Sequence, residues 1–489
     1  MKDRADITER AGYPVKKQPA TALIDPSIAD IINNPGRPSG YPPLAKIPQY
    51  IPGKSGVLAG IKSAIEYKQK GLKYFLEQIE RHGKIFRDQI GPYPIVVVAD
   101  REIIGQVLRN EDQLWSTGLA VERVTRGLRL KIDPNKRSRL MALDFEPHRQ
   151  YRQLVQPAFN MNAMKGYLSI IQKSFEDNLR AWPIKGKIGF KVEARRILSK
   201  LASRLFLGIY DANESARIEK ASQDYWNAVP VIIKSPLLSS TWKRGLQAIE
   251  TLSTMMQSLI PIRQVQGGED LFSQLCQTQK ETNCLDDDQL IDLMFGILFA
   301  AFDTTALALT SMAYLLARNP QWQTRLREEA LLIPEQPSLE DLQTMEQTEW
   351  VWKETLRLYP VSANSPRFSL RECKLGQYTI PPATLVFLSI GLLGYDSESW
   401  SSPDRFDPER FSPARAENKS PRHLFFPFGH GPHTCIGLQL ATLEMKLFWH
   451  RLLTRYKFHL AQDYTASHEL TPLGCVSGSV DLIVEEIQI

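Results

Sequence analysis

One long helical pattern spans residues 285–317, and its composition decides where such a helix can lie. Three aspartates, at 286–288, fall in its first turn, where negative charge favours the helix dipole. Residues 293–302 are apolar on every side, which is typical of a helix enclosed by protein. This run is shorter than the roughly 20 apolar residues that a membrane-spanning helix needs. The pattern therefore predicts a buried core helix.

Three polar residues, Asp303, Thr304 and Thr305, interrupt this apolar helix near its middle. The threonines can hydrogen-bond to carbonyls one turn earlier, or Asp303 can cap a new helix. A buried carboxylate nevertheless requires a partner or a functional role. The residues alone leave these alternatives open.

The N-terminal residues 1–55 are predicted to form a proline-rich arm rather than a folded unit. Nine prolines lie between positions 14 and 52, and such density blocks helices and favours extended chain. Residues 56–489 are predicted to form a single domain, because no internal repeat or low-complexity linker divides them.

The patterns within this domain predict a mainly α-helical fold with small β-sheets. Helical periodicity covers 57–82, and residues 94–99 read as a strand. Residues 112–147 are polar and irregular, which predicts a functional loop. Helical patterns dominate up to residue 360, short strands follow over 361–395, and one helix follows Cys435.

Charge and cysteine content exclude several classes of protein. Sixty Lys and Arg against 54 Asp and Glu give a net charge of +6, which is mild for a nucleic-acid-binding protein of 489 residues. The first 20 residues hold no apolar core of a signal peptide. The five cysteines are widely spaced and odd in number, which argues against a disulfide scaffold. We expect a cytoplasmic, monomeric protein without a transmembrane anchor and without a nucleic-acid partner.

The segment 425–441, FFPFGHGPHTCIGLQLA, places Cys435 between Gly431 and Gly437 and just before a helix. Amide groups at a helix N-terminus lower the pKa of a thiol, and glycine lets the backbone approach a flat ligand. Three interpretations remain open from the residues alone. They are a structural cysteine, a metal site with His430 and His433, and a single thiolate ligand of haem iron.

The pattern Phe428-x-x-Gly431-x-His433-x-Cys435-x-Gly437 resembles the haem-binding signature of the cytochrome P450 family. The resemblance implies the cytochrome P450 fold, with haem b buried between the long central helix and the cysteine loop. It makes Cys435 the iron ligand and places His433 against a haem propionate. Phe428, Gly431 and Gly437 become cofactor-binding residues.

The middle of the long helix is similar to the central-helix motif of that family. The likeness implies that Asp303 relays protons and that Thr304 steadies oxygen during its activation. Ala301 stands beside the cofactor where the family usually has glycine.

Other motifs of the family occur in the expected order. Glu354, Arg357 and Arg410 are expected to form a buried ionic network. His148 and Arg152, four residues apart on one helix face, and Arg367 are expected to bind the haem propionates.

The resemblance implies a monooxygenase that inserts one oxygen atom from O2 into a lipophilic substrate, such as a sterol, terpenoid, retinoid or fatty acid. The expected pocket residues are Phe299, Ala300, Phe302, Val361 and Val476. Because no flavin or Fe–S pattern is present, electrons from NAD(P)H are expected to arrive through a ferredoxin- or flavodoxin-type protein or a reductase. Arg149 and Lys446 are candidate docking residues for that partner.

Three alternatives remain. The first is a haem-thiolate isomerase, dehydratase or peroxygenase on the same fold. The second is a non-catalytic haem-binding protein. The third is a haem-free protein in which Cys435 is an ordinary core thiol.

Overall fold

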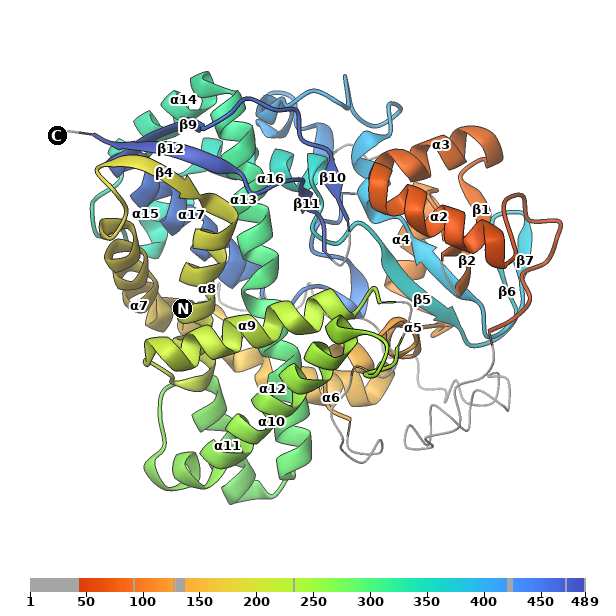
Figure 1. Cartoon of the computed structure of the whole chain (residues 1–489), viewed down its shortest axis with the longest axis horizontal. Helices are drawn as coiled ribbons and strands as arrows, with labels where there is room; N and C mark the ends of the chain where they lie inside the picture. The colour runs from red at the N-terminus through yellow and green to blue at the C-terminus, as the bar shows by residue number, and fades with distance from the viewer. Residues whose placement is uncertain are drawn as a thin grey trace, which may run out of the picture.

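The computed structural model describes residues 44–90, 93–125, 128, 137–231, 234–419, 425–470 and 473–487. A β-rich part with its own helices lies beside a larger helical part, through which the long central helix passes (Figure 1). This arrangement confirms the predicted fold class, a mainly helical protein with small sheets.

Most of the predicted N-terminal arm, residues 1–43, lies outside the described residues. Its last part, from Leu44, runs along the β-rich part. The Ala45 N–H donates to the Ala383 carbonyl over 3.0 Å, and Gly53 forms a parallel bridge with Arg87. This part of the arm therefore packs on the domain.

A five-stranded sheet forms the centre of the β-rich part, in the order β1-β2-β8-β5-β3. Its strands are β1 (Ile85–Ile90), β2 (Tyr93–Val98), β3 (Trp115–Ser116), β5 (Ser365–Ser369) and β8 (Leu385–Leu388). Strand β2 confirms the strand predicted at 94–99 and pairs in parallel with β8. Ile95 and Val97 pack into one apolar cluster, whereas Val96 and Val98 pack into another. Because both faces are covered, the strand is continuously apolar.

Four helices belong to this part: α2 (Val57–Lys70), α3 (Leu72–His82), α4 (Arg101–Arg109) and α5 (Thr117–Val124). The single helical pattern predicted over 57–82 is divided at Gly71, whose φ is 58°. A Cβ at Gly71 would lie 2.5 Å from the carbonyl oxygen of His468, so the chain must turn there with glycine.

The prediction that residues 112–147 form an irregular loop is wrong for much of the segment. It contains β3, α5 and the short helix η4 (Leu140–Ala142). The Ser116 hydroxyl accepts the Leu119 N–H and caps α5, a local signal that outweighs the weak periodicity of this segment.

The helical part surrounds the largest apolar cluster. Its helices are α6 (Phe145–Val155), α7 (Met161–Arg180), α8 (Phe190–Leu207), α9 (Ala212–Ala228), α10 (Ser240–Gln266), α11 (Leu271–Thr282), α12 (Asp287–Ala301), α13 (Asp303–Arg318), α14 (Pro320–Leu331), α15 (Leu339–Gln343), α16 (Glu346–Leu358) and α17 (Leu438–Arg455). The short helices are η5 (Gln156–Phe159), η6 (Ile390–Tyr395), η7 (Pro408–Phe411), η8 (Glu417–Lys419) and η9 (Gly431–His433).

Three small sheets complete the fold. They are β4 (Lys185–Gly189) with β12 (Asp481–Glu486) and β9 (Tyr456–Leu460), β6 (Cys373–Leu375) with β7 (Tyr378–Ile380), and β10 (His468–Glu469) with β11 (Cys475–Val476).

The central helix predicted over 285–317 is two helices, α12 and α13, that meet at Phe302. Asp286 begins α12 with a capping box that includes Gln289. At Phe302 the backbone leaves ideal helical geometry, with φ −110° and ψ −38°. The polar residues that follow, Asp303 and Thr304, therefore lie in the first turn of a new helix.

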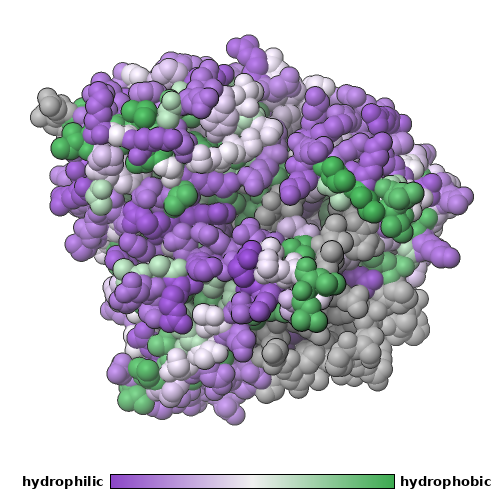
Figure 2. Space-filling model, in the orientation of Figure 1, coloured by the Kyte–Doolittle hydropathy of each residue, from purple (hydrophilic) through white to green (hydrophobic). Residues whose placement is uncertain are grey.

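The combined stretch Asp287–Arg318 is the one segment of the described residues that is long and apolar enough to cross a membrane. Its most apolar window is 78% buried inside the protein, which identifies it as a core helix. The face shown in Figure 2 is mainly hydrophilic, with apolar residues over α2 and the connection between α9 and α10. There Leu58 is 84% exposed and Leu237 is 93% exposed.

Candidate functional site

Cys435 lies at the end of a tight loop directly before α17. Its N–H donates to the carbonyl of Phe428 over 2.9 Å, and η9 shapes the chain between them. Gly431 has a φ of 74°, and a Cβ there would lie 2.1 Å from the Leu108 carbonyl oxygen of α4. Glycine is therefore required for the close packing of this loop on α4.

The Cys435 thiol is exposed, yet protein surrounds it closely enough to change its pKa. Burial raises the pKa of the thiol, whereas the Gly437 N–H and the nearby Arg152 favour the thiolate. The thiol is therefore accessible to a ligand although protein atoms crowd it. Such a thiol can lose its proton to a metal cation that approaches it.

Small residues form the accessible face of the central helix at the junction of α12 and α13. Ala300 is exposed, while Ala301 and Thr304 are half-buried. The Thr304 hydroxyl donates to the Ala300 carbonyl over 2.9 Å. This is the bond to a carbonyl one turn earlier that the sequence predicted as one alternative.

The carboxyl group of Asp303 is directed away from Thr304 and toward α8 and α9. It accepts a hydrogen bond from Ser222 Oγ at 2.6 Å, and its other oxygen lies 3.2 Å from Arg195 Nε. Burial raises the pKa of Asp303, although Arg195 and Ser222 act in the opposite direction. The buried acid therefore has partners that no local pattern in the sequence indicated.

Three elements bring basic side chains together beside the cysteine loop: α6, β5 and η9. We call His148, Arg152, Arg367 and His433 the basic cradle. The rings of His148 and His433 lie 4.1 Å apart between centroids, at an angle of 37°. Burial, followed by the charges of His433 and Arg152, lowers the pKa of His148 to about 3, so its ring is neutral.

The two arginines of the basic cradle have no carboxylate partner at ion-pair distance within the described parts of the chain. Arg367 is buried and donates to Ser365 Oγ at 2.8 Å and to the Pro366 carbonyl at 2.9 Å. Burial lowers the pKa of Arg367 to about 10 and also lowers the pKa of Arg152. Because an unpaired buried cation is costly, this arrangement suits an anionic ligand with more than one carboxylate.

Asp144, just before α6, is the acidic residue that touches the basic cradle. Its Oδ1 lies 3.4 Å from His433 Nε2 and accepts the Thr117 N–H at 2.8 Å. Its other oxygen accepts the Gly118 N–H at 3.0 Å and a hydrogen bond from Ser116.

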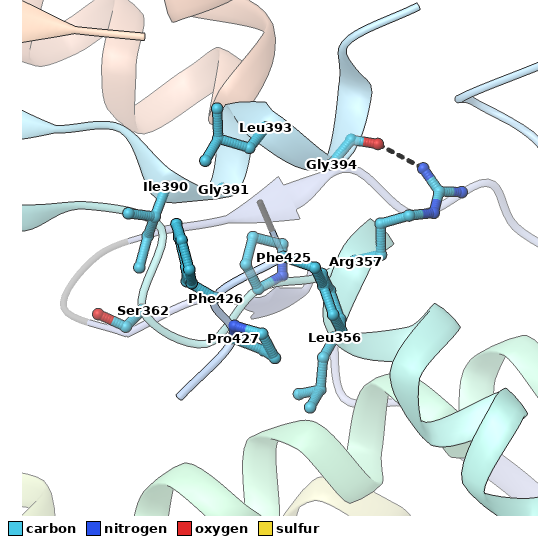
Figure 3. A pocket seen from close by; sticks show the side chains of 11 residues that line it. Leu356, Arg357, Ser362, Ile390, Gly391, Leu393, Gly394, Phe425, Phe426 and Pro427 are labelled. Atoms are coloured by element: carbon cyan, nitrogen blue, oxygen red, sulfur yellow. Dashed lines mark hydrogen bonds between the residues drawn. The ribbon is translucent and has the colours of Figure 1, made fainter. Parts of the chain in front are cut away.

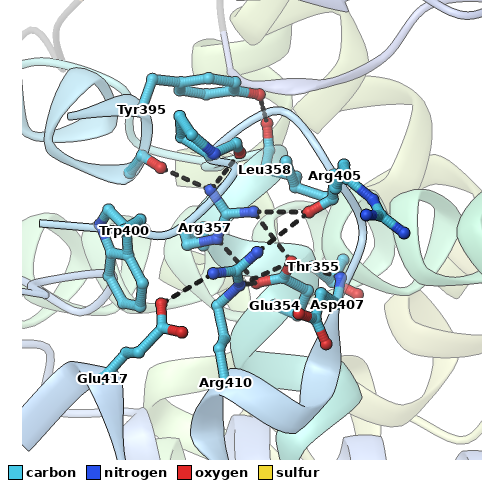
Figure 4. A network of polar contacts seen from close by, with 12 residues as sticks. Glu354, Thr355, Arg357, Leu358, Tyr395, Trp400, Arg405, Asp407, Arg410 and Glu417 are labelled. Carbon is cyan, nitrogen blue, oxygen red and sulfur yellow. Dashed lines mark hydrogen bonds and ion pairs between the residues drawn. The ribbon is translucent and has the colours of Figure 1, made fainter. Parts of the chain in front are cut away.

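A second group of charges lies behind the loop and is fully buried (Figure 4). Arg357 donates to both oxygens of Glu354, at 2.7 and 2.8 Å, and Arg410 Nε lies 3.1 Å from the same carboxylate. Arg410 also pairs with Glu417 at 2.8 Å. Further bonds from Arg357 reach the Gly394 carbonyl, so these charges have partners within the protein. We call these residues the closed network.

A small hollow separates the closed network from the cysteine loop (Figure 3). It is lined by residues that include Arg357, Ile390, Phe426 and Pro427. Its volume of about 20 Å³ is close to that of one water molecule and excludes a substrate.

The predicted pocket residues lie in different surroundings. Ala300 is exposed and Val361 is half-buried, whereas Phe302 and Val476 are buried in the main core. Phe299 is also buried and stacks on Tyr225, with 4.5 Å between ring centroids. The role of this set in substrate binding stays a prediction.

The docking prediction for Lys446 is wrong, because this side chain is only 7% exposed and pairs with Glu349 at 3.1 Å. Lys446 lies on a face of α17 that packs against the core, where its aliphatic stem is buried. The residue type alone does not reveal this burial. Arg149 is exposed and pairs with Glu146 at 2.8 Å, so it remains a candidate.

The metal site proposed as an alternative finds no support, since no three His, Cys, Asp or Glu among the described residues are placed to hold a metal ion. The His430 ring instead stacks on Phe426, with centroids 5.0 Å apart.

A family model for cytochrome P450 matches residues 52–478 of this chain. Cytochrome P450 136 of Mycobacterium tuberculosis is 33% identical over 336 residues, which are 66% of this chain and 68% of the relative. Cyclooctat-9-en-7-ol 5-monooxygenase of Streptomyces melanosporofaciens is 27% identical, over 78% of this chain and 84% of the relative. Cytochrome P450 26B1 of Mus musculus is 29% identical, over 78% of this chain and 76% of the relative.

The fold is similar to the solved structure of retinoic acid-bound cyanobacterial CYP120A1. The TM-score is 0.81, with 22% sequence identity over 91% of this chain and all of the other. The matched region includes the cysteine loop, the central helix, the basic cradle and the closed network. The chain therefore belongs to the cytochrome P450 family of haem-containing monooxygenases.

Proposed function

We propose that this cytochrome P450 binds haem b through Cys435 and inserts one oxygen atom from O2 into a lipophilic substrate. The observation that carries the proposal is the combination, beside one loop, of an accessible thiol and a basic cradle whose two arginines have no carboxylate at ion-pair distance among the described residues.

The donor set fits haem, whose iron would be held by the Cys435 thiolate and whose propionates would be held by the basic cradle. A thiolate is a known axial ligand of haem iron, and propionates are carboxylates that require basic partners. Arg152 and Arg367 would supply those partners with His148, while the Gly437 N–H favours the thiolate form of Cys435. When bound, haem supplies the electron-transfer and oxygen-activating chemistry of the reaction.

The chain's own residues would handle the protons. Asp303 retains a proton more readily than an ordinary carboxyl, because burial raises its pKa. In this structure it binds Arg195 and Ser222, so delivery of a proton toward Thr304 requires the carboxyl to leave these partners. The Thr304 hydroxyl, now bonded to Ala300, would donate to or accept from the reacting oxygen after a similar rotation.

The names of relatives support a lipophilic substrate. One relative is named for an alcohol, cyclooctat-9-en-7-ol, and the similar solved structure holds retinoic acid. The accessible face of the central helix carries Ala300 and Ala301, which offer no charge to bind a polar ligand. We expect terpenoids, retinoids, sterols or fatty acids, and a panel of them would reveal binding through shifts of the haem absorption band.

We expect a separate redox protein to supply electrons from NAD(P)H. The test is turnover with and without an added ferredoxin and its reductase. Product formed at the same rate from NADPH and the isolated chain would contradict this part of the proposal.

The thiolate assignment is tested by the absorbance difference between the reduced protein with and without carbon monoxide. The wild-type protein should show the red-shifted band of a thiolate-bound haem. Cys435→Ala should lose this band, while Cys284→Ala, which removes another exposed free thiol, should keep it. A band that survives in Cys435→Ala would contradict the assignment.

A further inference from the structure

The Asp144 carboxylate joins three segments of the chain at the basic cradle. It precedes α6 and accepts hydrogen bonds from Thr117, Gly118 and Ser116 at the start of α5. It also contacts His433 of the cysteine loop at 3.4 Å. Its side chain is only 12% exposed, so these contacts are largely shielded from water.

The start of α5 lies very close to Asp144 and to the residues before it. A Cβ on Gly118 would lie 2.6 Å from the Ala142 carbonyl oxygen and 2.9 Å from Asp144 Oδ2. Glycine at this position therefore lets the start of α5 approach the carboxylate closely enough for two N–H groups to donate to it.

His433 is held on two sides. Asp144 contacts its Nε2, and the His148 ring packs against its face. A histidine ring has two nitrogens, so a single nitrogen remains for any further partner. Arginine at this position would offer five N–H donors instead. The neutralisation of a carboxylated ligand therefore falls mainly on Arg152 and Arg367.

Asp144 is ionised despite its burial. Burial alone would raise its pKa, but His433, Ser116 and the Thr117 N–H together hold the pKa of Asp144 below its usual value. Its charge also acts on Arg367, whose cationic form it favours. A fixed negative charge consequently lies within a group of otherwise basic side chains.

We infer that Asp144 is a positioning residue for the edge of the haem, which orients His433 and adds a fixed negative charge beside the propionate-binding arginines. This inference rests on the proposed haem site. A negative charge near a redox centre disfavours the uptake of an electron, and the effect is stronger where water is excluded. The charge of Asp144 thus lowers the reduction potential of the haem, whereas the bond by which it holds His433 in the cysteine loop slows haem release.

The experiment compares the haem-loaded proteins Asp144→Asn and Glu146→Gln with the wild type. Glu146 is the matched control, because it lies two residues away in α6 and is 54% exposed. Asp144→Asn should raise the midpoint reduction potential measurably above that of Glu146→Gln. It should also transfer haem to apomyoglobin roughly five- to tenfold faster, as loss of one charge-assisted bond implies.

Equal potentials and equal transfer rates in Asp144→Asn and Glu146→Gln would overturn the inference while leaving the haem site intact. If Asp144→Asn does not fold, Ser116→Ala removes one bond to the carboxylate and keeps its charge. Faster haem transfer without a rise in potential is then expected, and unchanged transfer would overturn the inference. A wild-type protein that binds no haem would instead refute the proposed function itself.

Discussion

The closed network and the basic cradle both hold buried charges, but they differ in how those charges are matched. In the closed network, Glu354 binds two arginines, Arg357 and Arg410, while Glu417 and backbone carbonyls accept further hydrogen bonds from them. In the basic cradle, Arg152 and Arg367 have no carboxylate within ion-pair distance among the described residues. The protein completes the first group by itself and leaves the second incomplete.

This difference separates a structural site from a ligand site. Breaking a complete buried ion pair strands a charge and costs stability. Removing an unmatched buried cation has two effects. The ligand-free protein no longer bears the free-energy cost of burying that charge, and the ligand-bound protein loses one contact with the ligand. Two of the four predictions below, for Glu354 and Arg367, test this distinction directly, and the other two concern polar residues outside both groups.

The largest effect is expected for Glu354→Gln. The substitution leaves Arg357 and Arg410 buried without their shared carboxylate, which should lower the free energy of unfolding by about 3–5 kcal/mol. Unfolding in denaturant measures this loss of free energy. Glu409→Gln is the matched control, because Glu409 lies next to Arg410 but is 51% exposed in its pair with Arg325, and it should cost less than about 1 kcal/mol. Similar losses in both variants would contradict the structural role of the closed network.

Glu444 is a buried acid that belongs to neither group, since one of its oxygens has no hydrogen-bond partner among the described residues. Burial raises its pKa to about 8, and a bond from Thr305 only partly opposes this. The folded protein therefore binds one more proton than the unfolded chain between the ordinary carboxyl pKa and about 8. Its contribution to stability is complete at acidic pH and is lost as the pH rises through about 8.

Glu444→Gln should remove this dependence. Its free energy of unfolding, relative to that of the wild type, should rise between about pH 5 and the folded-state pKa of about 8, and should level off above it. Each unit of pKa shift corresponds to about 1.4 kcal/mol. Parallel pH profiles for the two proteins would show that Glu444 is not desolvated as the structure places it.

Arg367→Ala should affect haem retention rather than stability, in contrast to Glu354→Gln. The free energy of unfolding of the haem-free protein should change by less than about 1 kcal/mol, because no carboxylate is stranded. Haem transfer to apomyoglobin should become roughly tenfold faster, because a charge-assisted bond to a propionate is lost. Arg371→Ala is the control, because Arg371 lies four residues away and its side chain donates to the Asp112 carbonyl on the protein surface, and it should leave the transfer rate unchanged. A large loss of stability with an unchanged rate of haem transfer would show that Arg367 has a structural role and does not bind haem.

The smallest change in stability is expected for Thr304→Ala, whose hydroxyl makes one bond, to the Ala300 carbonyl across the junction of α12 and α13. We expect less than about 1 kcal/mol in unfolding. The ratio of hydrogen peroxide to product during turnover should nevertheless rise. An unchanged ratio would count against the proposed role of Thr304.

The sequence predicted what short spacings and continuous patterns determine. The cysteine signature, the strand at 94–99 and the spacing of Glu354 and Arg357 are local features that one segment displays by itself. The fold class followed from the same periodicities, since helix and strand patterns extend over many residues.

Contacts between distant segments were not predictable in this way. Arg195 and Ser222 meet Asp303 only because α8, α9 and α13 pack together. Asp144 reaches His433 across a separation of 289 positions, and nothing in its own neighbourhood marks it as more than a helix-capping residue. The burial of Lys446 likewise depends on how α17 packs and not on its sequence pattern.

One haem should bind at both sites, with its iron on Cys435 and its propionates on the basic cradle. A crystal structure of the haem-loaded protein tests this most directly. In that structure Cys435 Sγ should bind the iron, and both propionates should lie within hydrogen-bond distance of Arg152, Arg367 or His148. Iron bound through another side chain, or propionates that extend into solvent while these residues remain unpaired, would contradict it.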